Sequence, residues 1–263
     1  MKIHILGCHG SDLLLSHKRK PHSCTTCSFL LDDTLLLDVG TVGSQLPIEA
    51  QASIRHILLS HLHFDHIKGL PTLADNLSEM GGPPLVVAAI PEVIQGLRHH
   101  LFNNEVYPDF FKIPTGDRPV LSAQQLTCGK PYRAGKFICT PIPVNHTVPA
   151  VGFLVEDSTS AILYSGDTFM TEELWEVARG HRLLKAVFLE CSYPDGLEHL
   201  AVVSKHLTPR LFEKELAKLC RSDVKVFAYH LKPIYEDKIV HELMQLNLPN
   251  LVFIEEGQTI EIG

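Results

Sequence analysis

The stretch Ser60-His61-Leu62-His63-Phe64-Asp65-His66 decides how the rest of the sequence is interpreted. It directly follows a short apolar run that has the length and composition of a buried strand. In an extended or turning segment, residues two apart project to the same side, so His61 and His63 converge on one point. Asp65 and His66 then face a second point close by. Imidazole nitrogens together with a carboxylate are the ligands of a hydrolytic site that holds two metal ions.

A histidine-rich loop that binds metal only adventitiously is the alternative interpretation of this stretch. Such a tract is polar throughout, whereas here Leu62 and Phe64 alternate with the histidines and are expected to point inward. The metal-site interpretation is therefore favoured. It predicts further ligands at the ends of later strands.

Three later strand ends supply one candidate ligand each. His146, Asp167 and His230 all follow short apolar runs, and Gly166 permits a tight turn that aims the Asp167 carboxylate inward. A solitary strand-end histidine is more often a satisfied surface or core residue, so each candidate alone is weak. Their joint occurrence after the dense cluster strengthens the functional interpretation.

The composition of the chain excludes several classes of protein. With 263 residues, 45% of them hydrophobic, the chain can bury a substantial core, which disfavours a disordered or fibrous protein. The formal net charge is −7, from 23 basic and 30 acidic residues, and this disfavours binding to a nucleic-acid polymer. The 16 histidines stand out, because packing does not require them and neutral imidazole is the commonest metal ligand.

The cysteines and apolar runs predict a cytoplasmic protein that does not enter a membrane. Seven cysteines are an odd number and are spread along the chain, unlike a disulfide framework. The longest apolar run, Leu85–Ile90, is far shorter than the roughly 20 residues of a membrane span. The pair Cys24 and Cys27 invites a redox or zinc-ribbon interpretation, but without a second such pair structural thiols are favoured. The basic run Lys18-Arg19-Lys20 could guide an anionic substrate, although a solvated loop is the default.

Apolar runs of strand length alternate with fewer helical patterns. Strands are expected at Lys2–Leu6, Ser28–Leu31, Thr34–Asp38, His56–Ser60, Leu85–Ala89, Phe137–Pro141, Gly152–Glu156, Ala161–Ser165, Ala186–Glu190, Val224–Tyr229, Leu251–Glu255 and Thr259–Ile262. Helices are expected at Leu70–Met80, Pro91–Phe102, Thr171–Arg179, Thr208–Cys220 and Tyr235–Leu246. This pattern predicts two β-sheets covered by helices in a single α/β domain over residues 1–263.

The order of these ligands resembles the metallo-β-lactamase superfamily, specifically its hydrolases with two metals. The resemblance implies an αββα sandwich of two mixed β-sheets flanked by helices, and two divalent cations, Zn²⁺ first with Mn²⁺ or Fe²⁺ as alternatives. It assigns His61, His63 and His146 to one metal, Asp65, His66 and His230 to the second, and Asp167 to both. Asp38 matches an acid that supports such sites, although a turn-forming aspartate is an equal alternative.

Within this superfamily the chain is similar to the class II 3′,5′-cyclic-nucleotide phosphodiesterases. The similarity rests on the stretches from His100 to Phe110, Phe188 to Pro194 and Ser204 to Pro209. Phe64, Pro71-Thr72 and Tyr107 depart from the pattern of that class, which leaves the identity of the substrate open.

The resemblance implies hydrolysis of cyclic AMP or cyclic GMP to a nucleoside 5′-monophosphate, by attack of a hydroxide that bridges the two metals. The leaving 3′-oxygen requires a proton, and His206 is the candidate general acid, with a structural role as the alternative. Asp65 is counted with the catalytic residues as well as the ligands. Asn103, Tyr107 and Asp109 are candidate substrate contacts, although a packed surface loop is equally plausible.

Other functions remain open at this point. A tRNA 3′-end processing endonuclease shares the ligands but is expected to carry a basic RNA-binding arm. A lactonase or thioesterase shares them without needing the motif around His206. A flavodiiron-like redox protein normally carries glutamate at the position of His63, and a non-catalytic scaffold is expected to have lost ligands. The expected partner is a small cyclic nucleotide, and a homodimer is expected by resemblance alone.

Overall fold

The structure is a computed structural model that describes residues 1–15 and 22–263, so the basic run Lys18-Arg19-Lys20 lies outside the described residues. The first sheet has seven strands in the order β10 (Leu121–Gln125), β7 (Leu85–Ala89), β6 (His56–Leu58), β5 (Leu35–Leu37), β4 (Ser28–Leu31), β1 (Lys2–Gly7) and β18 (Thr259–Glu261). The second also has seven, in the order β11 (Tyr132–Ala134), β12 (Phe137–Pro143), β13 (Val151–Glu156), β14 (Ala161–Tyr164), β15 (Leu184–Glu190), β16 (Lys225–Tyr229) and β17 (Leu251–Phe253).

Both sheets are mixed in strand direction. In the first sheet β10, β7, β6 and β5 are parallel neighbours, and β4, β1 and β18 continue it with antiparallel pairs. In the second sheet β11 to β14 pair antiparallel, and β14 to β17 pair parallel. Two short hairpins stand apart, β2 (Leu13–Leu15) with β3 (His22–Cys24) and β8 (Pro114–Thr115) with β9 (Arg118–Pro119). The expected pair of mixed sheets is confirmed.

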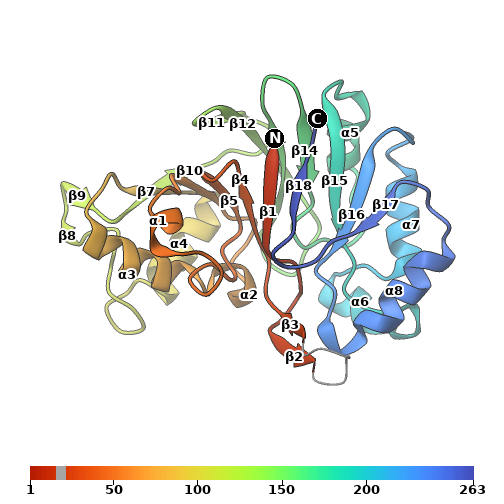
Figure 1. Cartoon of the computed structure of the whole chain (residues 1–263), viewed down its shortest axis with the longest axis horizontal. Coiled ribbons are helices and arrows are strands. Elements are labelled where there is room, and N and C mark those ends of the chain that lie inside the picture. Colours follow the sequence, from red (N-terminus) through yellow and green to blue (C-terminus); the bar gives the residue numbers. More distant parts are fainter. Residues whose placement is uncertain (16–21) are drawn as a thin grey trace.

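Helices cover the outer faces of the two sheets, as Figure 1 shows, with α1, α3 and α4 on one side and α5, α7 and α8 on the other. Their bounds are α1 Ile48–Gln51, α2 Phe64–Ile67, α3 Leu70–Met80, α4 Pro91–His100, α5 Glu173–Gly180, α6 Glu198–Ser204, α7 Pro209–Ala217 and α8 Glu236–Gln245, with 3₁₀ turns at Asp195–Leu197 and Pro233–Tyr235. Within residues 1–15 and 22–263, none of the helices has the length and apolar character needed to cross a membrane.

Aromatic rings fill the space between the two sheets. Phe29 on β4 makes edge-on contacts with Tyr164, Phe188 and Tyr229 of the second sheet, at centroid distances of 5.5, 5.4 and 5.5 Å. All four rings are buried. Strands of this kind are covered on both faces, which explains why their sequences lack polar alternation. On the outer face of the second sheet, α5 and α7 bury Trp175 and Phe212 in a separate apolar layer.

The prediction that Phe64 points inward is wrong. The chain does not continue as an extended segment after His63 but begins the single-turn helix α2 at Phe64. At this first helical position the Phe64 side chain turns outward, and 67% of its surface is exposed. Leu62, in contrast, packs against the core between the sheets.

Candidate metal centre

Four of the predicted ligands come from the chain that leaves β6. His61 and His63 precede α2, whereas Asp65 and His66 lie within it. The change from coil to helix brings the second pair back toward the first, because consecutive residues of a helix are separated by about 100° around its axis. Gly69 follows α2 and lies so close to the backbone of Val39 that a Cβ there would approach its oxygen to 2.7 Å.

The other three ligands come from the ends of strands in the second sheet. His146 follows β12, Asp167 follows β14 and His230 follows β16. Gly166 has a φ of +60°, and a Cβ there would lie 2.9 Å from the oxygen of Val151, so the turn that presents Asp167 requires glycine. All seven predicted ligands therefore meet where the two sheets face each other.

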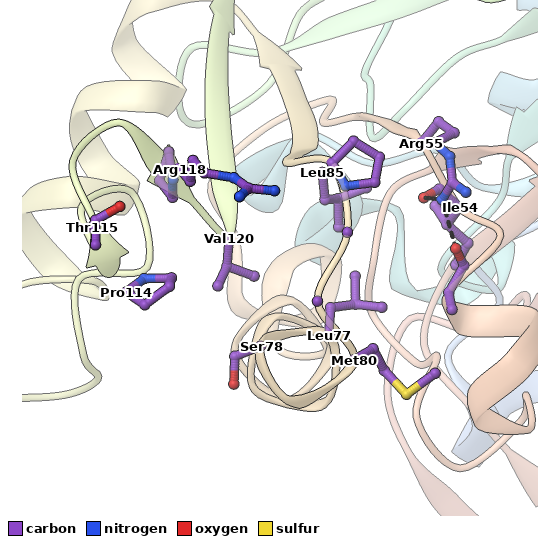
Figure 2. A pocket seen from close by; sticks show the side chains of 15 residues that line it. Ile54, Arg55, Leu77, Ser78, Met80, Leu85, Pro114, Thr115, Arg118 and Val120 are labelled. Carbon is purple, nitrogen blue, oxygen red and sulfur yellow. Dashed lines mark hydrogen bonds between the residues drawn. The ribbon is translucent and has the colours of Figure 1, made fainter.

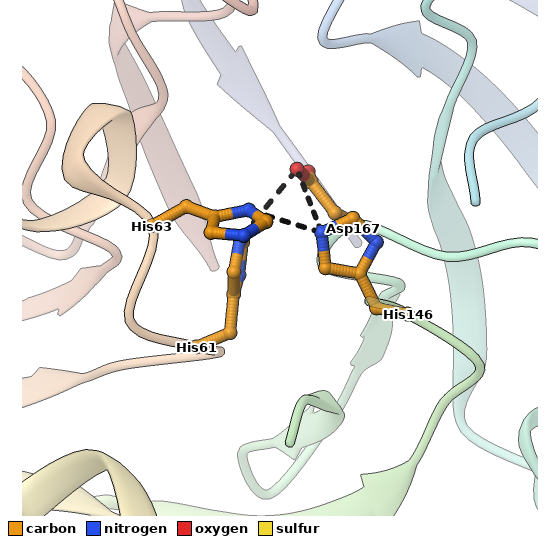
Figure 3. A group of neighbouring side chains, drawn as sticks. All are labelled: His61, His63, His146 and Asp167. Carbon is orange, nitrogen blue, oxygen red and sulfur yellow. Dashed lines mark hydrogen bonds and ion pairs between the residues drawn. The ribbon is translucent and has the colours of Figure 1, made fainter. Parts of the chain in front are cut away.

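Four of these side chains form the first group, drawn in Figure 3: His61, His63, His146 and Asp167. Their ligand atoms all lie within 4.8 Å of one another. The Nδ1 of His63 is 3.1 Å from the Nε2 of His146. The Asp167 Oδ2 lies 3.6 Å from the Nε2 of His61 and 3.9 Å from that of His146. One ion at the centre can contact all four donors.

The second group consists of Asp65, His66 and His230, and Asp167 lies between the two groups. The Nε2 atoms of His66 and His230 are 3.3 Å apart, and Asp65 Oδ2 is 3.4 Å from the Nε2 of His230. Asp167 approaches His66 with Oδ1 and His230 with Oδ2, both at 3.3 Å. Its carboxylate can therefore bridge two ions.

Hydrogen bonds to Asp38 and Ser60 orient two of the histidine rings. The Nδ1–H of His66 donates to Asp38 Oδ2 at 2.7 Å. The Ser60 hydroxyl donates to the same oxygen at 2.8 Å, so it accepts from the Nδ1–H of His61 at 2.9 Å. Tyr164 also donates to this carboxylate, at 2.7 Å. Asp38 thus directs the Nε2 atoms of both rings toward the site, as partners of metal-bound histidines commonly do.

Two further rings are oriented in the same way from the second sheet. His146 donates its Nδ1–H to the carbonyl of Lys205 at 3.1 Å. His230 donates its Nδ1–H to the Ser192 hydroxyl at 2.9 Å, because that hydroxyl gives its own proton to Glu190 at 3.0 Å. The Nε2 atoms of both rings therefore also face the site with a lone pair.

Facing lone pairs require a cation or a proton between them. The Nε2 atoms of His66 and His230 face each other, and the buried Nε2 of His61 and Oδ1 of Asp167 have no hydrogen-bond partner within the described part of the chain. Burial opposes protonation of His66, but Asp167 and Asp38 hold the pKa of His66 well above its ordinary value. A proton and a divalent cation therefore compete for this position, as expected at a metal site.

The remaining ionisation states suit a metal. Burial lowers the pKa of His146 to about 4, and burial together with the neighbouring His66 lowers the pKa of His61. Burial opposes ionisation of Asp167, yet His230 and His66 keep its pKa well below the ordinary value. At neutral pH His61 and His146 are neutral and Asp167 is charged, which are the forms that bind a divalent cation.

His206 lies against this cluster and is held by an acid. Its ring stacks on His230 with centroids 5.3 Å apart, and its Nδ1–H donates to Glu190 Oε1 at 2.8 Å. Burial opposes protonation, but Glu190 raises the pKa of His206 above its ordinary value. Glu190 was not identified as a site residue from the sequence. The sequence feature that could have identified Glu190 is the same as for Asp38: an acidic residue at the end of a buried strand.

The three candidate substrate contacts lie in the loop after α4. The Asn103 amide accepts from the backbone of Glu105 and Val106 and donates to the carbonyl of His99. Asp109 accepts from the backbone of Phe111. Tyr107 packs on neighbouring rings of the same loop. These contacts shape the loop and do not connect it with the metal cluster, so the substrate role of the three residues remains a prediction.

Two pockets lie near the first sheet, and neither is lined by the candidate ligands. One, of about 390 Å³, lies between the end of α3 and the β8–β9 hairpin (Figure 2) and is lined by none of the seven candidate ligands. A wider one, of about 910 Å³, is lined by Phe64 and Lys68 at the two ends of α2, and likewise by none of the seven candidate ligands. The wider pocket therefore adjoins the segment that carries two ligands.

Two mixed sheets with a histidine and aspartate cluster at their common edge define the metallo-β-lactamase class of proteins. The family model described as "Beta-lactamase superfamily domain" matches residues 37–226, and the chain belongs to this superfamily. The resemblance inferred from the sequence is thus confirmed.

Relatives of known name fall into two groups. A probable 3′,5′-cyclic-nucleotide phosphodiesterase of Yersinia pestis is 26% identical over 242 residues, covering 79% of this chain and 68% of the relative. A ribonuclease Z of Porphyromonas gingivalis is 29% identical over 173 residues, covering 60% of this chain and half of the relative. The crystal structure of unliganded yeast PDE1 superimposes with a TM-score of 0.81 over 98% of both chains at 20% identity, which shows a shared fold.

Proposed function

We propose that this chain is a metal-dependent phosphodiesterase that hydrolyses 3′,5′-cyclic nucleotides to nucleoside 5′-monophosphates. The observation that carries the proposal is the pair His206 and Glu190, a proton donor held against a cluster of metal ligands. A phosphodiester whose leaving group is an alkoxide needs such a donor. The similarity to the Yersinia pestis relative supports the same substrate class.

The donor set supports two divalent cations. His61, His63 and His146 are proposed to hold one, and Asp65, His66 and His230 the other, with Asp167 shared. Nitrogen-rich sites with carboxylates suit Zn²⁺, with Mn²⁺ and Fe²⁺ as the alternatives. The chemistry that such cations supply when bound is Lewis-acid stabilisation of phosphoryl oxygens and a water of lowered pKa.

The chain's own residues supply the proton. Glu190 accepts from Nδ1 of His206, so the second ring nitrogen is the one available to give a proton to the departing 3′-oxygen. The raised pKa keeps this imidazole protonated closer to neutral pH. His206 is 6% exposed, so little of its surface is accessible to bulk water.

Substrate is proposed to enter beside α2. His63 and Asp65 are the partly exposed members of the ligand set, whereas His61, His66 and His230 are buried. Phe64 lies between them in the sequence, exposes its ring and lines the wider pocket. An exposed aromatic ring can stack on a nucleobase. Asn103, Tyr107 and Asp109 remain candidate contacts for the ribose or base.

Endonucleolytic processing of tRNA 3′ ends is the second candidate function, favoured by the ribonuclease Z relatives. The two candidates use the same cluster but differ in substrate size. A net charge of −7 favours a small anion over an RNA, because an RNA gains affinity from phosphate contacts along its length.

Three further proposals concern the cellular compartment, the domain organisation and the oligomeric state. The seven cysteines are all free thiols, which supports a reducing compartment such as the cytoplasm. We also propose that residues 1–263 act as one hydrolase domain. A homodimer is proposed by similarity alone.

The test combines metal analysis of the purified protein with a substrate panel. The panel contains cyclic AMP, cyclic GMP, bis(p-nitrophenyl) phosphate, a precursor tRNA with a 3′ trailer, a lactone and a thioester. An Asp167→Asn variant serves as the metal-site control. Turnover of a cyclic nucleotide that is lost in the control supports the proposal. Turnover of the precursor tRNA alone selects the second candidate, and turnover of only the lactone or thioester contradicts both.

A further inference from the structure

A second group of metal-binding donors lies behind the loop of His230. His9 follows β1, Cys24 ends β3 and Glu236 begins α8, and donor atoms of the three residues lie within 4.8 Å of one another. His9 and Cys24 are 4% and 1% exposed. None of the three belongs to the ligand set at the edge of the sheets. A thiol, an imidazole and a carboxylate from three separate segments form a mixed donor set typical of Zn²⁺.

The two nitrogens of the His9 ring have different partners. The Nδ1 lies 2.5 Å from Glu256 Oε1, which is too close for an ion between them and is the distance of a short hydrogen bond. The backbone N–H of Thr25 donates to the same carboxylate oxygen at 3.0 Å and holds it in place. Glu256 therefore orients the ring as a carboxylate orients a metal-bound histidine.

The opposite nitrogen of His9 has the spacing of a metal ligand. Its Nε2 lies 3.6 Å from Glu236 Oε1. Two ligands on a tetrahedral Zn²⁺, each about 2.1 Å from the ion, are separated by about 3.4 Å. The nitrogen–oxygen distance is therefore compatible with two ligands of one ion.

We propose that His9, Cys24 and Glu236 form a second metal site, specific for a thiophilic divalent cation such as Zn²⁺, with Glu256 orienting the histidine. The three donors occupy three tetrahedral positions, and a water or a further donor completes the fourth. The site is structural, because it connects the end of β1, the β3 strand and the start of α8.

The residues of this site lie next to the segment that carries His230. The backbone N–H of His230 donates to the carbonyl of Cys8 at 2.6 Å, and the N–H of Gly10 donates to the carbonyl of Leu231 at 3.1 Å. A Cβ on Gly10 would lie 2.8 Å from Cε1 of the His230 ring, so the two segments are in direct contact. An ion bound by His9 therefore fixes the chain on both sides of this contact.

Cobalt substitution tests the proposal independently of catalysis. The cluster at the edge of the sheets contains no thiol, so a thiolate-to-Co²⁺ charge-transfer band can arise only from a cysteine ligand. We expect the wild-type protein reconstituted with Co²⁺ to show this band. We expect Cys24→Ser to lose the band together with one equivalent of bound metal. Cys27→Ser and Cys139→Ser are the matched controls, because both thiols are also buried and neither belongs to a group of candidate metal donors in the described part of the chain, and both should keep the band.

Two further variants keep the test decisive. Glu236→Gln changes a proposed ligand at the partly exposed start of α8, so this variant is expected to fold even if Cys24→Ser does not. The variant should bind Co²⁺ more weakly at this site. Asp167→Asn impairs the other cluster and should retain the band. A wild-type protein without a thiolate band, or a band that survives in folded Cys24→Ser, would overturn the proposal and show that a proton occupies this cluster instead of a metal.

Discussion

Replacing Asp38 by asparagine should weaken metal binding without altering any proposed ligand. Asp38 is fully buried and accepts four hydrogen bonds, from Ser60 N and Oγ, Tyr164 Oη and His66 Nδ1, at 2.7 to 2.8 Å. Its φ is +53°, a region that asparagine adopts as readily as aspartate, so the backbone can remain unchanged. The substitution therefore changes the charge and the acceptor atoms but little else.

The expected magnitude follows from the bonds that the amide cannot accept. An asparagine with its oxygen toward Ser60 N places an NH₂ group against Ser60 Oγ, Tyr164 and His66, which all donate to Oδ2 in the wild type. Loss of such a partner of a metal-bound histidine typically costs 10- to 100-fold in metal affinity. This factor corresponds to about 1.4 to 2.8 kcal/mol. Removing one partner from a buried charged network should also lower the unfolding free energy by about 3–5 kcal/mol.

Metal affinity is measured by competition with a chromophoric chelator, and stability by urea denaturation of the metal-free and metal-loaded protein. Asp157→Asn is the control, because Asp157 accepts backbone hydrogen bonds from Thr159 and Ser160 in a turn that does not contact the site. The control should keep the metal affinity of the wild type. If Asp38→Asn binds metal within twofold of the wild type, then Asp38 does not orient a metal ligand.

Four other outcomes are expected. His206→Gln should lower kcat for cyclic-nucleotide hydrolysis by about 10²- to 10⁴-fold with unchanged metal content, and full activity would remove His206 from the reaction. The protonated form of His206 is the proposed donor, and Glu190 raises the pKa of His206, so kcat should fall as the pH rises through that pKa. In Glu190→Gln this fall should begin at a lower pH. A pH profile that does not shift in the variant contradicts the pairing of His206 with Glu190. Removal of metal by a chelator should abolish phosphodiesterase activity and lower the melting temperature, and addition of Zn²⁺ or Mn²⁺ should restore both. Activity that persists in the metal-free protein would contradict a metal-dependent reaction. Phe29→Ala should lower the unfolding free energy measured in urea by about 3–5 kcal/mol, because the Phe29 ring contacts three aromatic rings of the opposite sheet. A loss below about 1 kcal/mol would show that these contacts are replaceable.

The sequence predicted best those elements whose residues decide their own conformation. Ser28–Leu31, Leu85–Ala89 and Leu70–Met80 have the predicted bounds, because each is a continuous apolar run or an amphipathic repeat with clear ends. The hairpins β2–β3 and β8–β9 were not predicted, since strands of two or three residues carry too few side chains to show a periodicity.

The composition of the candidate site was predictable, but its connections were not. The seven proposed ligands follow strand ends in a recognisable order, and the structure brings them together. The roles of Glu190 and Ser192 depend on the pairing of β14, β15 and β16, which places their side chains beside His206 and His230. Such contacts between distant segments leave no local pattern. For the same reason the outward position of Phe64 was missed, because the short helix α2 depends on its surroundings.

The division of the ligands between the two sheets sets the order of events during synthesis. His66 and His230 approach each other across 164 positions of sequence. A nascent chain that ends before β16 already carries all four residues of the first group, but it lacks His230, which completes the second group. Metal binding by the second group would therefore have to follow the pairing of β16 with the second sheet, and occupancy of that group would report that this strand is in place.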